Sequence, residues 1–256
     1  MSGIFYGIGV GPGDPELMTI KAVRLIRESD VIAVPGETAQ ESVAYKIARQ
    51  AVPELAEKQL LAIPMPMTHD REKREENHRR GAERIEKILG QGMDVVFLTL
   101  GDPTVYSTFF YLQELVRKDG YPTEVVSGVP SFCAAAARAQ MPLVMWNEPL
   151  FVVPAAHSGT RKHGLSGTFG GSRAAEETHG SGEEALAACG EKTARAGGTL
   201  VYMKSGKKLR QLKDAAQAEG REMVFLENCG MEHEKICRDP EEIPDEAGYY
   251  SLLIVK

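Results

Sequence analysis

Four glycines alternate with other residues between Gly7 and Gly13, in the stretch "YGIGVGPGDPELMTIKAVRLI". An apolar run that passes through such glycines into a helical pattern is typical of a nucleotide site, because glycine lets the backbone approach a ligand closely. A dinucleotide loop needs the spacing G-x-G-x-x-G, and here Pro12 or Asp14 occupies the third glycine position, depending on where the count starts. The spacing therefore argues against a dinucleotide.

The chemistry of the same loop also argues against a phosphate ligand. Pro12 has no amide proton to donate, and Asp14 and Glu16 place carboxylates where a phosphate prefers the positive end of a helix. A neutral or cationic cofactor fits these residues better. The alternative is a glycine-lined turn that only packs a strand against a helix.

A second polar turn follows the apolar run that ends at Leu100, in "LTLGDPTVYSTFFYL". The chain bends through Gly101, Asp102 and Pro103, and we expect a helix with several hydroxyl side chains to begin directly afterwards. The Asp102 carboxylate can accept hydrogen bonds from an ammonium group or from ribose hydroxyls. It can also cap the helix, and the two roles are compatible.

The elements that must position these turns alternate between strand and helix patterns. Apolar runs that end in Gly or Pro recur in "IFYGIGVG", "DVIAVPG", "LLAIPMP", "DVVFLTLGDP" and "TEVVSGVP", with helical patterns such as residues 19–29 between them. This order predicts a first α/β domain over residues 1–130 with a mainly parallel sheet covered on both faces. Ligands of such sheets bind at the carboxyl ends of the strands.

The pattern changes after Pro130. A helix of small residues, "SFCAAAARAQ", precedes "EPLFVVPA", "GTLVYMKSGKKL", "EMVFLENCGMEHEK" and "GYYSLLIVK", which indicate a second α/β domain over residues 131–256 with a mixed sheet. The fold class is therefore α/β with two α/β domains, and we expect an active-site cleft between them. The segment near residues 156–184 is rich in Gly, Ser, Thr and His, which predicts a long flexible loop.

Composition limits the kinds of partner. The net charge is −6, which argues against a broad nucleic-acid surface, and no apolar run is long enough to cross a membrane. The four cysteines form no C-x-x-C pair, and the six histidines form no i, i+4 pair on a periodic helix, so no metal site is indicated. Without a signal peptide pattern, we expect a cytoplasmic protein.

Five stretches taken in order, "GIGVGPGDPELMT", "LGDPTVYST", "SGVPSFCAAAA", "LVYMK" and "ENCG", resemble the tetrapyrrole (class III) methyltransferases of corrin and siroheme synthesis. Three more, "PMTHD", "YSTFFYL" and "IPDEAGYYSLLIVK", look like the branch that methylates the C-20 meso carbon of its substrate. The resemblance covers nearly the whole chain except residues 156–184. It implies S-adenosylmethionine as the methyl donor, a tetrapyrrole substrate and a homodimer.

The resemblance also implies where the cofactor is held. Carried over by position, its contacts fall on Pro12, Leu100, Gly101, Asp102, Val105, Pro130, Ser131, Met203 and Gly230. Related sequences often carry a hydroxyl residue at position 130, so Pro130 can contact the cofactor only through its ring or carbonyl. Met203 can also be a core filler at the end of an apolar strand.

The implied reaction is an in-line displacement in which a nucleophilic ring carbon attacks the methyl group of the sulfonium, so the protein must chiefly orient donor and acceptor. Asp102 and Tyr106 are candidates for the base that removes a proton, although water or a substrate carboxylate would serve as well.

The substrate carries carboxylates, and the run Lys204, Lys207, Lys208 and Arg210 is the candidate to bind them, with Lys204 and Lys207 foremost. A solvated surface cluster is the alternative for this run. It is also the expected role of Arg71, Lys73 and Arg74 in the charged helix of residues 68–89, which could otherwise meet an anionic ligand or a partner subunit.

Two other functions stay open on the sequence. The first is a tetrapyrrole methyltransferase that acts at another carbon, and the second is a nicotinamide-dependent oxidoreductase, which the glycine spacing disfavours.

Overall fold

The computed structural model describes residues 2–66, 68, 70–155 and 197–256, so the predicted loop near residues 156–184 lies outside the described residues. The chain forms two compact units. Unit 1 comprises Met1–Ala134 together with Cys229–Glu232, and unit 2 comprises Ala135–Asn228 and His233–Lys256. Within the described ranges, no helix is both long and apolar enough to cross a membrane.

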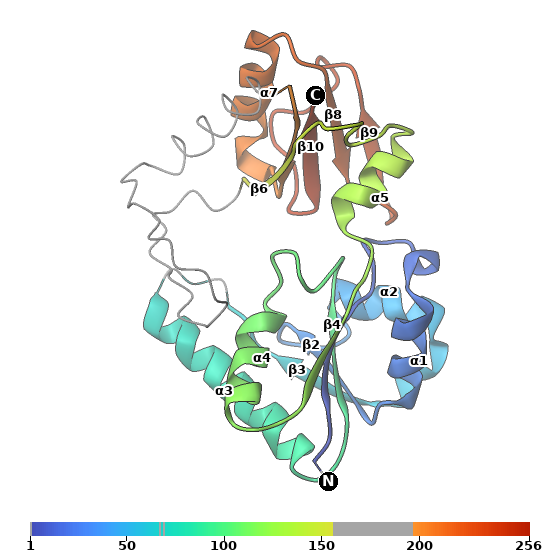
Figure 1. Ribbon diagram of the computed structural model, residues 1–256, viewed down its shortest axis with the longest axis vertical. Helices are drawn as coiled ribbons and strands as arrows, with labels where there is room; N and C mark the ends of the chain where they lie inside the picture. The colour runs from blue at the N-terminus through green and yellow to red at the C-terminus, as the bar shows by residue number, and fades with distance from the viewer. Residues whose placement is uncertain (1, 67, 69, 156–196) are drawn as a thin grey trace. The chain divides into compact units, whose positions relative to one another are not determined.

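Unit 1 is built on a five-stranded sheet with the order β3-β2-β4-β1-β5, in which every pair is parallel (Figure 1). Its strands are β1 (Phe5–Gly9), β2 (Val31–Pro35), β3 (Gln59–Ile63), β4 (Val95–Thr99) and β5 (Thr123–Val126). The three central strands are rich in Val, Ile and Phe because both of their faces are buried. The parallel sheet expected from the alternating apolar runs is confirmed.

Helices cover both faces of this sheet. One face packs against α1 (Ile20–Glu28) and α2 (Val43–Ala51), and the other against α3 (Arg71–Leu89) and α4 (Phe109–Lys118). The period of two along a strand divides the core: Tyr6 and Ile8 lie in the first cluster, whereas Phe5 lies in the second. Each fully buried side chain of this size contributes about 1.5–3 kcal/mol through burial. Short 3-10 turns η1 (Pro15–Leu17) and η2 (Pro53–Glu57) complete the connections.

Side chains before the first turn fix where two of these helices begin. The Thr19 hydroxyl accepts a hydrogen bond from the Ala22 amide at 3.2 Å, and an Asp70 carboxylate oxygen accepts one from the Lys73 amide at 3.2 Å. Such caps satisfy amides that have no partner inside the helix. They place the start of α1 at Ile20, the residue after Thr19, as the sequence predicts.

Unit 2 contains a five-stranded mixed sheet with the order β6-β7-β10-β8-β9. Strands β6 (Leu150–Pro154) and β7 (Thr199–Met203) are parallel, whereas β10 (Ser251–Val255) runs antiparallel to both β7 and β8 (Met223–Glu227), and β9 (Lys235–Cys237) runs antiparallel to β8. Helix α7 (Leu209–Ala218), which follows the 3-10 turn η3 (Gly206–Lys208), packs on one face. Helix α5 (Ser131–Arg138) spans the point where the chain passes from unit 1 to unit 2. The mixed second sheet is confirmed.

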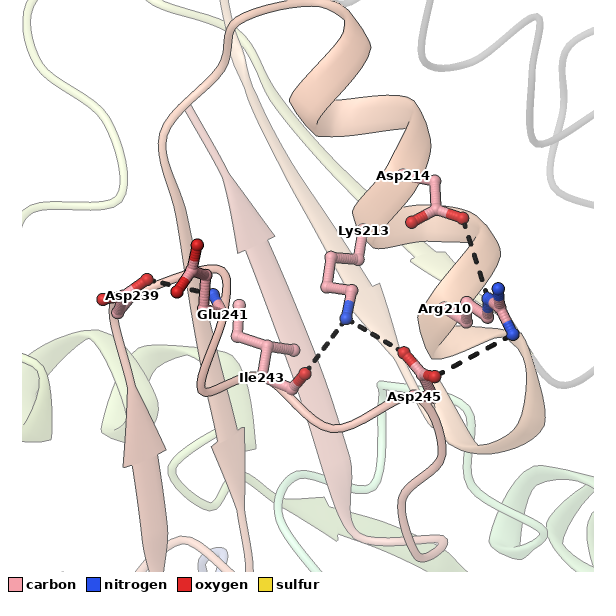
Figure 2. A network of polar contacts seen from close by, with 7 residues as sticks. All are labelled: Arg210, Lys213, Asp214, Asp239, Glu241, Ile243 and Asp245. Atoms are coloured by element: carbon pink, nitrogen blue, oxygen red, sulfur yellow. Dashed lines mark hydrogen bonds and ion pairs between the residues drawn. The ribbon is translucent and has the colours of Figure 1, made fainter.

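A polar clasp ties the loop before β10 to α7 (Figure 2). The Lys213 ammonium donates hydrogen bonds to the Ile243 carbonyl oxygen at 3.1 Å and to an Asp245 carboxylate oxygen at 3.0 Å. Arg210 lies 3.9 Å from Asp245 and 4.0 Å from Asp214. The hydrogen bond and charge of Lys213 lower the pKa of the Asp245 carboxyl below its usual value.

This clasp predicts a stability that depends on acid. Because the folded-state pKa of Asp245 is lowered, the ionised clasp contributes fully above the unfolded pKa of about 3.9, and the contribution is lost as the pH falls through the lower folded-state pKa. We expect D245N to reduce the free energy of unfolding at pH 7 and to differ less from the wild type as the pH falls below about 4. Urea titrations across this range measure the effect.

The matched control is D214N, because Asp214 is an exposed carboxylate of the same group that makes only a long ion pair. Its effect should be smaller and should vary less with pH. Identical pH profiles for D245N and D214N would contradict the role given to Asp245.

Candidate functional site

Three neighbouring strands of unit 1 end beside one another with glycine. Gly9 ends β1, Gly101 follows β4 and Gly128 follows β5. A Cβ atom added to Gly9 would lie 2.5 Å from the Gly101 carbonyl oxygen and 2.7 Å from the Gly128 Cα atom, and one added to Gly128 would lie 2.2 Å from the same oxygen. No side chain fits at Gly9 or Gly128, so backbone packs directly against backbone at these two positions.

The first glycine loop is joined to the second polar turn by its backbone. Gly11 and Gly101 form an isolated antiparallel bridge, in which the Gly101 amide donates to the Gly11 carbonyl at 2.8 Å and the Gly11 amide donates in return at 3.3 Å. Both residues have positive φ, 76° and 72°, which glycine adopts at little cost. The two motifs recognised separately in the sequence therefore form one structure.

The side chain of Asp102 connects these strand ends through hydrogen bonds. It is buried, and its Oδ2 accepts a hydrogen bond from the Gly128 amide at 3.0 Å, while its Oδ1 accepts from the Thr104 amide at 2.7 Å and from the Thr104 hydroxyl at 2.5 Å. The side chain thus connects the ends of β4 and β5. These bonds occupy most of the lone pairs of the carboxylate.

The helix after Asp102 begins later than the sequence suggests. Residues 103–106 form turns, Tyr106 has a left-handed backbone with φ of 49°, and α4 starts at Phe109. This conformation costs a non-glycine residue about 1–2 kcal/mol and cannot continue a helix. The Ser107 hydroxyl then accepts from the Phe109 amide at 3.1 Å and lies 3.2 Å from the Thr99 hydroxyl, so Asp102 caps a turn and Ser107 takes the position next to the helix.

The loop of residues 10–14 packs against a segment from the far end of the chain. A Cβ atom on Gly13 would lie 2.3 Å from the Cys229 carbonyl oxygen, and one on Gly230 would lie 2.7 Å from the Asp14 amide nitrogen. Gly230 also has a positive φ of 71°. The structure therefore brings Gly230 into contact with the turn that contains Pro12, as a common cofactor site requires.

The segment after β5 lies against the same edge. A Cβ atom on Gly101 would lie 3.8 Å from the Ser131 amide nitrogen. The Pro130 carbonyl oxygen accepts hydrogen bonds from the Cys133 and Ala134 amides at 3.1 and 3.2 Å, at the start of α5. Because this carbonyl is engaged, the ring is the part of Pro130 that is left for a ligand. Leu100 and Val105 flank the same turn, and both are partly buried.

The first glycine loop is separated from helix α1, unlike the loop and helix of a dinucleotide site. The Asp14 side chain accepts from the Glu16 amide at 2.9 Å to cap η1, and α1 begins only at Ile20. The glycine loop therefore does not present the start of a long helix to a ligand, which agrees with the failed glycine spacing.

The remaining predicted site residues lie in unit 2. Met203 ends β7 with a buried side chain, and its carbonyl oxygen accepts from the Ala155 amide at 2.8 Å. Lys204 follows with a left-handed backbone, φ of 56°, and its Nζ lies 4.8 Å from the centre of the Tyr249 ring. Lys207 is exposed in η3. Burial and the neighbouring Tyr249 raise the pKa of the Tyr250 hydroxyl.

The three basic residues singled out at the start of the charged helix all have interaction partners in the protein. Arg71 pairs with Glu75 at 2.6 Å, Lys73 lies 3.6 Å from Asp70, and Arg74 also has an interaction partner. The side chains of the Arg71–Glu75 and Lys73–Asp70 pairs are exposed. This arrangement supports the interpretation as a solvated helix face.

Two contributors to the site were not singled out from the sequence. Gly128 lies in the stretch "SGVPSFCAAAA". The sequence feature that could have indicated its contribution is a glycine just after an apolar strand. Cys229 meets Gly13 through its backbone carbonyl oxygen, which no residue type can reveal.

Comparisons with known proteins agree with this geometry. The sequence model of a family described as Tetrapyrrole (Corrin/Porphyrin) Methylases matches residues 5–244. A probable cobalt-precorrin-2 C(20)-methyltransferase of Methanocaldococcus jannaschii is 37% identical over 150 residues, which cover 58% of this chain and 63% of the relative. A precorrin-2 C(20)-methyltransferase of Sinorhizobium is 27% identical over 271 residues, covering 100% of this chain and 97% of the relative.

A solved structure supports the fold. The uroporphyrin-III C-methyltransferase of Thermus thermophilus, complexed with S-adenosylhomocysteine, matches with a TM-score of 0.64 and 22% identity, covering 99% of this chain and 97% of the other. The two-domain α/β architecture expected from the sequence is thus confirmed as the architecture of this family.

The central position of Asp102 predicts a loss of stability when it is replaced. D102A leaves the Gly128 and Thr104 amides without their acceptor, which should lower the free energy of unfolding by about 1–3 kcal/mol. D102N should also destabilise, because its amide group faces protein donors on both sides and offers only one oxygen. Urea denaturation measures both changes.

T104A is the matched control, since it removes only the hydroxyl donor from an exposed residue and keeps the backbone hydrogen bond. We expect it to cost about 1 kcal/mol or less. A D102N variant as stable as the wild type would contradict the argument.

Proposed function

Because this chain belongs to the family of tetrapyrrole (corrin/porphyrin) methylases, we propose that it transfers a methyl group from S-adenosylmethionine to the C-20 meso carbon of precorrin-2 or of its cobalt-containing counterpart, in cobalamin biosynthesis. The C-20 position is supported by the two related C(20)-methyltransferases, one of which matches over the full chain. The stretches "PMTHD", "YSTFFYL" and "IPDEAGYYSLLIVK" support the same branch.

The observation that carries the proposal is the cradle of backbone at the edge of unit 1. Gly9, Gly13, Gly128 and Gly230 all lie where a Cβ atom would collide with backbone. A ligand at this edge meets backbone groups at close range. Pro12 cannot donate a hydrogen bond, and the nearby Asp14 carboxylate disfavours a phosphate, so a nucleoside with a positive sulfonium fits better than a dinucleotide.

The residues proposed to hold the cofactor follow from this cradle and from the resemblance. S-adenosylmethionine supplies an already activated methyl group when bound. The protein orients it and excludes competing geometries. The proposed contacts are Pro12, Leu100, Gly101, Asp102, Val105, Pro130, Ser131 and Gly230 in unit 1, and Met203 in unit 2.

The same geometry separates the two candidates for a proton acceptor. Asp102 already accepts three hydrogen bonds from the protein, and we assign it a positioning role. Tyr106 lies on the turn directly after Asp102 with 43% of its side chain exposed, so it is the candidate that a substrate can reach. Water or a substrate carboxylate stays an equally good acceptor.

We also propose a homodimer, which the resemblance implies, and a cytoplasmic location, as the sequence analysis expects. Light scattering during size-exclusion chromatography measures the mass in solution and tests the first of these.

The reaction predicts a specific product. Incubation with S-adenosylmethionine and precorrin-2, metal-free or loaded with cobalt, should add one methyl group by mass, and carbon NMR with a labelled methyl donor should place it on C-20. Comparing the two rates identifies the preferred form. A label on another carbon would show that the scaffold acts at a different position, and NADH consumption without methyl transfer would favour an oxidoreductase.

Packing against Gly13 predicts a defect in cofactor binding. In G13A the new methyl group collides with the Cys229 carbonyl and must displace the segment around Gly230. Overpacking of this kind costs about 1–3 kcal/mol, so S-adenosylhomocysteine should bind about tenfold more weakly in calorimetric titration.

The control is G90A, at the end of α3, where a Cβ atom would approach other atoms no closer than 3.3 Å and φ is negative. This variant should bind S-adenosylhomocysteine like the wild type. Unchanged affinity in G13A would remove the glycine cradle as the cofactor site.

A further inference from the structure

Lys204 has a backbone conformation that is uncommon for a lysine. Its backbone lies in the left-handed region, with φ of 56°, and its amide donates to the Ser251 carbonyl at 2.8 Å. Its Nζ lies 4.8 Å from the centre of the Tyr249 ring, within the range of a cation–π interaction. The residue is partly buried, and the contact with the Tyr249 ring gives the ammonium group a defined position.

This ammonium group has no carboxylate beside it within the part of the chain that the structure describes. Lys21 and Lys213, by contrast, pair with the carboxylates of Glu124 and Asp245. Among the described residues, the Lys204 ammonium contacts the neutral face of the Tyr249 ring. The position of the charge is thus fixed by a ring that cannot neutralise it.

The Tyr249 ring beside the charge packs against a second exposed ring. Tyr249 and Tyr250 pack edge to face with centres 5.3 Å apart, and they are 43% and 36% exposed. Both precede β10, whose residue Leu252 pairs with Met203 of β7. The charge and the rings therefore lie at the end of unit 2 where the proposed cofactor residue Met203 lies.

We propose that Lys204, set by Tyr249, binds one carboxylate at the edge of the tetrapyrrole and so determines which meso carbon faces the methyl donor. This inference rests on the proposed function, because it takes a polycarboxylated tetrapyrrole as the substrate. A charge fixed in place pairs with a carboxylate at a smaller loss of side-chain entropy than a freely moving lysine. The adjacent rings offer a flat apolar surface to the macrocycle.

The other basic residues of this run lack that combination. Lys207 is exposed in η3, and Arg210 lies near Asp214 and Asp245. The Nζ of Lys208 is buried, where a large ligand cannot reach it. The structure thus distinguishes Lys204 from Lys207, the other residue of the run that the sequence analysis places foremost.

The test compares three variants, K204M, K204R and Y249L, with the control K118M. The control removes an exposed lysine at the end of α4 in unit 1. We expect K204M to raise the KM for precorrin-2 about tenfold and to leave the affinity for S-adenosylhomocysteine unchanged. K204R, which keeps the charge, should recover part of the loss. Y249L should lie between wild type and K204M, and K118M should match the wild type.

A second readout reports the orientation of the substrate. If Lys204 sets the ring edge, the product of K204M should contain methyl groups at carbons other than C-20, detectable by carbon NMR with a labelled donor. Retained thermal stability of K204M separates this effect from misfolding.

Failure of this inference differs from failure of the proposed function. Suppose that the wild type methylates precorrin-2. The inference is then overturned if K204M keeps the wild-type KM and product. It is also overturned if K207M weakens binding as much as K204M does. If the wild type does not methylate precorrin-2, the proposed function fails, and titration with uroporphyrin III followed by absorbance still tests the carboxylate site. Equal affinity of wild type and K204M for that porphyrin would overturn the inference too.

Discussion

The close approach of three parallel strand ends in unit 1 is the constraint on which the rest of the site depends. Gly9 and Gly128 lie against the Gly101 carbonyl at distances that exclude any side chain. This packing lets the amide of Gly128 reach Asp102, and it lets Gly11 and Gly101 pair as a short antiparallel bridge. The buried Asp102 carboxylate then accepts hydrogen bonds from the Gly128 and Thr104 amides, which links the ends of β4 and β5.

A backbone edge of this kind suits methyl transfer from a sulfonium. The donor needs no further activation, and the largest contribution that a protein can make is to orient donor and acceptor. Rigid backbone groups hold an adenosyl ligand with little loss of conformational entropy. The absence of a long helix directly after the glycine loop fits the same chemistry, because such a helix end would favour anions.

Contacts between distant parts of the sequence complete this edge. Residues Cys229–Glu232 lie after most of the strands of unit 2, yet they pack with unit 1 against Gly13 and Asp14. In unit 2, the antiparallel pairing of β7 with β10 brings Lys204 beside residues near the carboxyl terminus. The proposed site residues of each unit thus come from segments that are far apart in the sequence and meet only when the sheet of that unit is formed.

The sequence by itself determined the type of fold. The alternation of apolar runs with helical patterns predicts the parallel sheet of unit 1, because strands buried on both faces must be continuously apolar. The spacing around Gly7–Gly13 argued against a dinucleotide, and five motifs in order indicated the family that the comparisons support. These properties are local, or they depend only on order along the chain.

Only the tertiary structure decided which of the quoted residues meet. Capping and ligand binding were both open for Asp102 in the sequence, and its hydrogen bond with Gly128, which forms because β5 pairs with β1, could not be read from it. The start of α4 at Phe109 depended on the left-handed Tyr106, and the distinction of Lys204 from Lys207 depended on Tyr249. Sequence patterns carry the periodicity of burial, whereas such contacts depend on strand order and on single backbone angles, which neither composition nor spacing records.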